Sequence, residues 1–226
     1  MIPKTAHSCG VCGAPTATPH RAPTPELAPD LDLRPGEPTR STLKQWIMVC
    51  RQCGAAAPDL SVLTPAARPI LDTENYRTLR GTGSKFCRYA AICLANGNRK
   101  EAGAAMLQAA WSADDANEDD NARIWRLEAA ALWADPPDEE TALRQIDALR
   151  RAQEFAQAEA EAAAWVSRVR DGEGRQILAF QRARIATADA GSYRISSALR
   201  PPAHSPHVAH GKRPAAKGFL ARLFGR

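Results

Sequence analysis

Apolar residues recur every three or four positions from about residue 84 to residue 188, among charged and small residues. This spacing predicts amphipathic helices, each with one apolar face. Turn or capping residues interrupt it at Gly97-Asn98, at Asp114–Glu118 and at Pro136-Pro137. The pattern predicts six helices, over Ser84–Asn96, Arg99–Ser112, Asp119–Ala134, Asp138–Ala152, Glu154–Arg170 and Glu173–Ala188.

Two boundaries of these helices need separate comment. Asp119 or Asp120 is expected to cap the third helix, and Asp138 the fourth. No Gly or Pro occurs from Asp138 to Asp171, so one long helix is an alternative to two. Because the apolar positions there do not keep the alternating spacing of a coiled coil, we favour two helices with a turn near Gln153.

The first 60 residues follow a different pattern, which is set by four cysteines. Cys9 and Cys12 form one Cys-x-x-Cys-Gly motif, and Cys50 and Cys53 form a second. Four thiolates complete a tetrahedral structural zinc site and leave no open position for catalysis at the metal. A rubredoxin-like iron site and a reactive dithiol are the alternatives, and an absorbance spectrum separates iron from zinc.

The two cysteine motifs indicate a zinc ribbon, a small β module, over residues 1–60. Ribbons usually place about 15–20 residues between the pairs, and here 37 intervene. Residues 14–40 hold seven prolines and are expected to form an extended insertion that accounts for the excess. Residues 44–49 are expected to form a strand that enters the second pair, and residues 61–83 a connector.

One helix pair carries a repeat pattern of large and small residues. The sequence order large, large, small, large, Gly, small, large, small is met by Phe86, Tyr89, Ala90, Cys93, Gly97, Ala102, Met106 and Ala109. Residues 83–116 therefore resemble a tetratricopeptide repeat. A poorer match, with Gln153 where Gly is usual, runs through Ile146, Leu149, Ala158, Ala162 and Trp165. An ordinary helical bundle is the alternative.

The whole layout is similar to that of bacterial proteins in which a four-cysteine ribbon precedes tetratricopeptide-like helices. The resemblance implies a mainly α chain with an all-α repeat domain over residues 84–189. It also implies a concave groove that binds a peptide or protein. One end of that groove would be lined by small or uncharged residues, namely Ser84, Cys87, Ala91, Leu94 and Ala95. The other end would present Asp147, Arg150 and Arg151, and we expect the two arginines to bind the partner.

The net charge of +5 comes from the end of the chain. Residues 190–226 contain seven basic residues and no acidic one, which leaves residues 1–189 at −2. Residues 1–60 carry +1 before a zinc–thiolate centre adds −2, a balance that does not favour a phosphate-binding surface. A nucleic-acid-associated ribbon factor therefore stays an alternative rather than the main interpretation.

Residues 190–226 are expected to be a disordered basic tail. His204, His207 and His210 recur every third residue there, and we read them as part of that tail. Residues 217–226 form a short amphipathic end with its apolar side chains at Phe219, Leu220, Leu223 and Phe224. Ten residues are too few to hold a helix alone, so this end would order only on a partner groove or an anionic membrane surface.

The remaining polar and sulfur-containing groups are read as structural. Cys87 and Cys93 are expected to be buried thiols, the run 114–120 a capping turn, and the tryptophans of the helices core residues. All five histidines lie near the termini, so we predict no catalytic centre. With no secretory signal and reduced thiols, the chain is expected to be a cytoplasmic, non-enzymatic zinc-binding adaptor.

Overall fold

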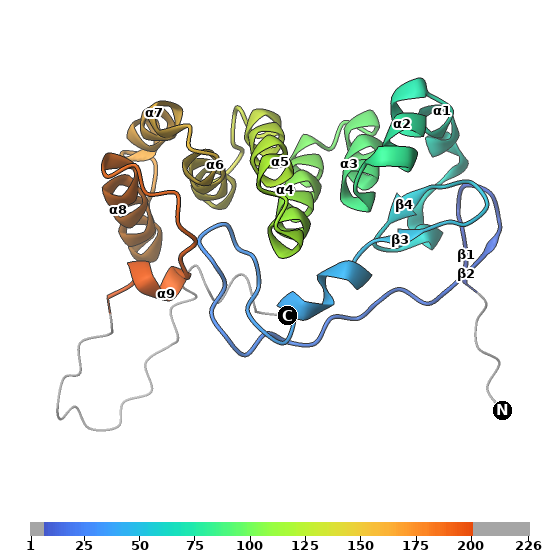
Figure 1. The fold of residues 1–226 in the computed structure, drawn as a ribbon, viewed down its shortest axis with the longest axis horizontal. Helices are drawn as coiled ribbons and strands as arrows, with labels where there is room; N and C mark the ends of the chain where they lie inside the picture. Colours follow the sequence, from blue (N-terminus) through green and yellow to red (C-terminus); the bar gives the residue numbers. More distant parts are fainter. Residues whose placement is uncertain (1–6, 201–226) are drawn as a thin grey trace. The chain divides into compact units, whose positions relative to one another are not determined.

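The computed structural model of the chain describes residues 7–200 and confirms the predicted fold class (Figure 1). The chain is mainly α, with a small N-terminal module of β-hairpins. It divides into two compact units, which are described separately below. Unit 1 comprises residues 1–27 and 34–135, and unit 2 comprises residues 28–33 and 136–226. Residues 201–226, which include the three tail histidines and the amphipathic end, lie outside the described part.

Unit 1 begins with two antiparallel hairpins of two-residue strands. Strand β1 (His7–Ser8) pairs with β2 (Pro15–Thr16), with His7 opposite Thr16. Strand β3 (Met48–Val49) pairs with β4 (Ala56–Ala57), with Met48 opposite Ala57. The predicted strand over residues 44–49 is therefore mostly wrong, because the 3-10 helix η1 (Arg40–Gln45) takes up its first part.

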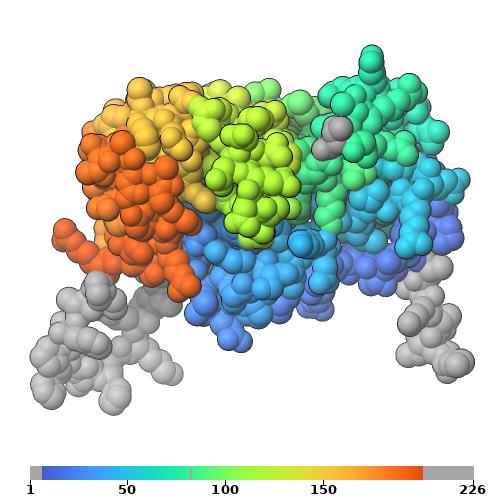
Figure 2. All heavy atoms as spheres, viewed as in Figure 1, coloured from blue at the N-terminus to red at the C-terminus, as the bar shows by residue number. Residues whose placement is uncertain are grey.

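Element η1 is held by contacts with its own turn and with a helix of the same unit. The indole Nε1 of Trp46 donates a hydrogen bond to the Thr42 hydroxyl at 2.8 Å. The Trp46 ring also meets Trp111 edge-to-face, with the ring centroids 6.4 Å apart. In the space-filling view the blue residues of this segment lie directly against the green helical residues (Figure 2).

The predicted connector of unit 1 contains regular structure. It forms, in order, η2 (Leu60–Val62), η3 (Pro65–Ala67), α1 (Arg68–Leu71) and α2 (Glu74–Thr82). Helix α2 begins after Thr73, whose hydroxyl accepts a hydrogen bond from the N–H of Tyr76. Sequence periodicity missed these elements because most of them are shorter than three helical turns.

Three longer helices complete unit 1, each close to its predicted range. They are α3 (Lys85–Ala95), α4 (Arg99–Ala116) and α5 (Asp119–Leu132). Asn98 caps α4, and Asn117, with φ +58°, ends it four residues later than predicted. The expectation that Asp119 or Asp120 caps α5 is wrong: Glu118 is at the cap, without a side-chain hydrogen bond to the helix backbone, and both aspartates lie in the first turn.

The first two residues of the acidic run lie in the last turn of α4 and pair with arginines. Asp114 pairs with Arg126 at 2.5 Å, and Arg126 is almost fully buried. Asp115 accepts two hydrogen bonds from Arg34, at 2.6 and 2.7 Å. The insertion residue Arg34 is thereby fixed to the end of α4.

Unit 2 contains the remaining helices in the predicted order. They are α6 (Glu139–Arg151), α7 (Phe155–Trp165), α8 (Gly172–Ala186) and α9 (Ile195–Ala198). Gln153 adopts φ +66° between α6 and α7, which confirms the turn predicted there. Asp138 caps α6 as predicted, accepting from the N–H of Thr141 at 2.8 Å. The predicted disordered tail starts too early, since α9 and the residues before it pack on unit 2.

Small residues let neighbouring helices approach closely, and large ones fill the space beside them. Helix α4 packs against both α3 and α5 in unit 1, and α6 packs against α7 and α8 in unit 2. Cys87, Cys93 and three of the helical tryptophans are buried as predicted, whereas Trp125 is half-buried. Within residues 7–200 we find no helix that is long and apolar enough to cross a membrane.

The boundary between the compact units differs from the predicted domain boundaries. The sequence interpretation divided the chain near residues 60 and 84, but unit 1 runs through both positions to Asp135. The physical reason is a shared apolar core. Residues of the cysteine motifs and residues of α1, α2 and α3 are buried in one cluster.

The close packing of α4 on the end of α5 is tested by Gly103→Ala. An added Cβ at Gly103 would lie 2.4 Å from Nε1 of Trp133, whose indole donates to the Lys100 carbonyl. We expect the free energy of unfolding to fall by about 1–3 kcal/mol in a urea denaturation. Gly81→Ala is the matched control, because its Cβ meets nothing within 4 Å in α2. That variant should gain about 0.5–1 kcal/mol, and equal effects of the two changes would contradict the packing described.

Candidate metal centre

Two tight turns of the same geometry present the four predicted cysteines. In the first, the N–H of Cys9 donates to Ala14 O at 2.8 Å and the N–H of Gly13 donates to Cys9 O at 2.7 Å. In the second, the N–H of Cys50 donates to Ala55 O at 2.8 Å and the N–H of Gly54 donates to Cys50 O at 2.9 Å. The two turns therefore present their cysteine pairs from the same backbone conformation.

The glycine after each motif is required by this geometry. Gly13 has φ +74° and Gly54 has φ +76°, in the left-handed region that other residues rarely adopt. A left-handed residue at this point turns the chain back into the second strand of each hairpin. The Cys-x-x-Cys-Gly motif thus provides the two sulfur ligands and also the glycine turn that orients them.

The four sulfur atoms come together as one group. All of them lie within 4.8 Å of one another. The Sγ atoms of Cys9 and Cys53 are 3.8 Å apart, and those of Cys12 and Cys50 are 3.6 Å apart. Four thiolates around one zinc ion at the usual Zn–S distance would be separated by about 3.8 Å. The donor set therefore fits a tetrahedral metal ion without rearrangement, and a four-cysteine group of this kind can bind a metal ion.

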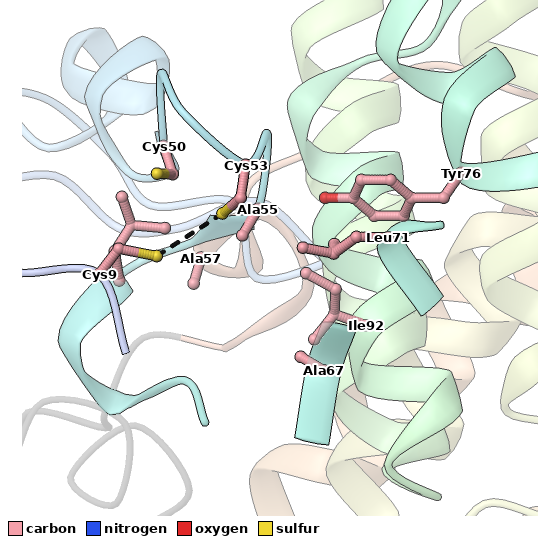
Figure 3. Packing of buried hydrophobic residues seen from close by; sticks show 10 residues of the cluster. Cys9, Cys50, Cys53, Ala55, Ala57, Ala67, Leu71, Tyr76 and Ile92 are labelled. Atoms are coloured by element: carbon pink, nitrogen blue, oxygen red, sulfur yellow. Dashed lines mark hydrogen bonds between the residues drawn. The ribbon is translucent and has the colours of Figure 1, made fainter. Parts of the chain in front are cut away.

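The cluster is part of a hydrophobic core (Figure 3). Cys9 and Cys50 are 1% and 3% exposed, and Ala55 and Ala57 beside them are fully covered. On the helical side the same core contains Leu71, Tyr76 and Ile92, among others. The cysteine turns consequently have no core of their own, separate from the helices.

One polar contact joins the second turn to helix α2. The hydroxyl of Tyr76 donates to the carbonyl of Gly54 at 3.0 Å, and Tyr76 is fully buried. Burial raises the pKa of Tyr76 to about 12, so the hydroxyl keeps its proton for this bond at neutral pH. The sequence interpretation missed Tyr76, since nothing in the period of a short helix marks a tyrosine that reaches a cysteine turn.

The thiols of the cluster differ in acidity. Burial raises the pKa of Cys9, and burial together with the neighbouring thiols raises the pKa of Cys53 to about 12. At Cys50 burial acts in the same direction, but backbone hydrogen bonds of Cys53 and Gln52 lower the pKa to about 7. At neutral pH Cys9 and Cys53 therefore lose their protons only when a cation compensates the charge. Metal binding must release protons and weaken as the pH falls.

Three of the five residues expected to line the apolar end of the groove lie together in the structure. A groove of about 470 Å³ in unit 1 is lined by residues of α2, α3, α4 and α5, including Cys87, Ala91 and Leu94. Ser84 instead caps α3, and Ala95 lines a separate depression beside α1. The groove is largely apolar, as expected.

The two arginines of the predicted basic end are covered in this structure. Arg150 is fully buried, bonded to Asp147 and to Asp189 O, and so is not exposed to a partner. Arg151 is nearly covered and pairs with Asp32 at 3.1 Å. Helical position alone could not reveal this, because the group that meets Arg151 comes from the insertion. A short alternation of acidic and apolar residues, Asp30-Leu31-Asp32-Leu33, is the sequence feature that could have indicated an extended segment there.

The other predicted partner-binding residues lie outside the described residues. They are the apolar side chains of the C-terminal end, Phe219, Leu220, Leu223 and Phe224. Their expected contact with a partner groove or an anionic membrane surface stays a prediction.

No protein-family model, curated protein or solved structure matches this chain. What can be stated of the predicted resemblance is therefore the coarse layout: an N-terminal four-cysteine cluster on small hairpins, followed by helices.

The assignment of all four cysteines to one metal ion is tested by Cys50→Ser. The purified chain should contain about one metal ion per molecule, and the variant should lose most of it because a serine oxygen replaces one of four sulfur ligands. Elemental analysis by mass spectrometry measures the content. Cys87→Ala removes a buried thiol outside the cluster and should keep the metal. Equal metal content in the two variants would contradict the assignment.

Proposed function

We propose that this chain is a non-enzymatic protein–protein interaction adaptor in which a structural zinc ion stabilises a helical binding domain. The observation that carries the proposal is the position of the four-cysteine cluster inside the core of α1, α2 and α3. Four cysteines leave a tetrahedral ion no open position for substrate, which favours a structural role over a catalytic one.

Zinc is the proposed metal because its chemistry suits this donor set. In structural sites zinc is bound by four ligands in a tetrahedral arrangement, and thiolates are among its preferred ligands. When bound, the ion would neutralise half of the charge of the four thiolates and hold the two turns together.

The interaction role is supported by the groove over α2, α3, α4 and α5. Its lining is mainly apolar, and Leu94 in it is 45% exposed. Glu128 and Arg99 add one group of each charge. Exposed apolar side chains in a groove with few charges are typical of a surface that receives the apolar face of a peptide or helix. A tetratricopeptide-like helix pair would present such a groove.

Removing the metal tests the structural role of the ion. A zinc chelator should speed amide hydrogen exchange in the two hairpins and in α1, α2 and α3, because their common core loses its central group. Exchange in α6, α7 and α8 of unit 2 serves as the internal reference and should not change. Mass spectrometry of the exchanged chain locates the effect. Unchanged exchange in unit 1 would contradict a structural metal.

The adaptor role is tested by placing a photo-crosslinking amino acid at Leu94, in the groove, and in a second variant at Val62. Val62 is 71% exposed and outside the groove. In cells that express the protein, the Leu94 variant should form a reproducible covalent adduct with another protein, and the Val62 variant should not. If neither position gives an adduct, or both give the same ones, the groove is not a partner site.

A further inference from the structure

A short piece of the proline-rich insertion is built into unit 2. Residues 28–33 belong to this unit, although the chain before and after them belongs to unit 1. Asp30 lies opposite Arg194 in an antiparallel bridge. The N–H of Leu31 donates to Tyr193 O at 2.9 Å, and the N–H of Ile195 donates to Pro29 O at 2.9 Å. This is the main-chain pairing by which an extended peptide adds to a strand-like edge.

Side chains of the segment add selectivity to this pairing. Leu31 is 2% exposed and Asp32 is fully buried. The carboxylate of Asp32 pairs with Nη1 of Arg151 at 3.1 Å. In an extended chain Leu31 points to the side opposite Asp30 and Asp32. Because a buried carboxylate is costly without a cationic partner, the site selects an acidic residue directly after an apolar one.

The receiving surface is shaped by contacts within the helical part of unit 2. Nε and Nη2 of Arg150 both donate to Oδ1 of Asp147, at 3.1 and 2.7 Å, and Nη1 donates to Asp189 O at 2.6 Å. The guanidinium lies over the ring of Tyr193, 5.7 Å from its centroid. The hydroxyl of Tyr193 donates to Asp189 at 2.6 Å. The edge at Tyr193 therefore also has contacts that do not involve residues 28–33.

The occupying segment has little structure of its own to lose. Between β2 and η1 the chain forms neither a helix nor a strand longer than the single bridge at Asp30. The N–H of Leu33 donates to Asp30 O at 2.9 Å, and the turn it closes ends the docked stretch. The contact thus consists of about four residues with two main-chain hydrogen bonds, which is the size of a short linear peptide ligand.

We propose that this surface of unit 2 is a peptide-docking site, and that residues 29–32 occupy it as an intramolecular ligand which an extended acidic peptide of a partner protein replaces. The matching ligand has a leucine between two aspartates, after a proline. The inference extends the adaptor role proposed above: it adds a second surface and names the chemistry of its partner. A tethered ligand acts at an effective concentration of about 1 mM, so the site is mostly closed to a free peptide.

The experiment measures binding of a fluorescein-labelled peptide with the sequence of residues 26–34 to the full chain by fluorescence anisotropy. Leu31→Ser with Asp32→Asn in the protein weakens the internal ligand. We expect this double variant to bind the peptide about tenfold more tightly than the unmodified chain, because the tethered competitor is lost. Asp32→Asn alone, which keeps the size of the side chain, should give a smaller gain.

Matched controls separate specific docking from charge attraction. Adding Arg151→Glu to the double variant should reduce the affinity about tenfold, since the partner of the buried carboxylate becomes acidic. Adding Arg168→Glu makes the same charge change at an exposed arginine of unit 2 and should leave binding unchanged. A peptide in which both aspartates are asparagines should not bind.

Three results would overturn the proposal. The first is a folded double variant that binds no peptide, which would make the segment a fixed brace. The second is loss of helical circular dichroism in that variant, because a replaceable ligand cannot be required for the fold. The third is a concentration-dependent dimer of the unmodified chain that the double variant does not form, which would assign the site to a second copy. Each result leaves the groove of unit 1, and hence the crosslinking test of the adaptor role, unaffected.

Discussion

Four sulfur atoms converge on one point from two turns that are 37 residues apart, and this convergence constrains the rest of unit 1. Burial opposes the ionisation of Cys9 and Cys53, and at Cys53 the neighbouring thiols oppose it as well. A divalent cation removes both costs at once. Cys9, Cys50 and Cys53 are buried in one cluster with residues of α1, α2 and α3. The charge of the thiolates and the packing of these helices therefore contribute together to the stability of unit 1.

This coupling compensates for the short strands of the module. Two-residue strands and a segment with few bulky side chains cannot form an independent core. The hairpins instead share Leu71, Tyr76 and Ile92 with the helices, and the hydroxyl of Tyr76 satisfies the carbonyl of Gly54. A metal ion bound at a cluster that is continuous with a helical core in this way would fix the position of the helices. Such a site has no need of an open ligand position.

Much of this arrangement could be predicted from the sequence, because the relevant information is local. The Cys-x-x-Cys-Gly motifs specify their turns, and the six longer helices follow from apolar spacing and from caps such as Asp138. The turn at Gln153 could be placed because the apolar residues around it do not keep the alternating spacing that a coiled coil needs. Contacts between distant parts could not be predicted. No local pattern links Asp32 to Arg151 or Tyr76 to Gly54, and burial of Arg150 depends on residues that follow α8. The groove-lining residues on α3 do line a groove, whereas Arg150 and Arg151 are covered by groups that are distant in the sequence.

The central claim is that a metal ion bound by four thiolates and nothing else organises unit 1. X-ray absorption at the zinc edge of the purified full chain tests it most directly, because the spectrum gives both the metal and its ligands. The account predicts zinc with four sulfur neighbours at about 2.3 Å. A spectrum with nitrogen or oxygen atoms bound to the metal, or a protein without stoichiometric metal, would contradict it.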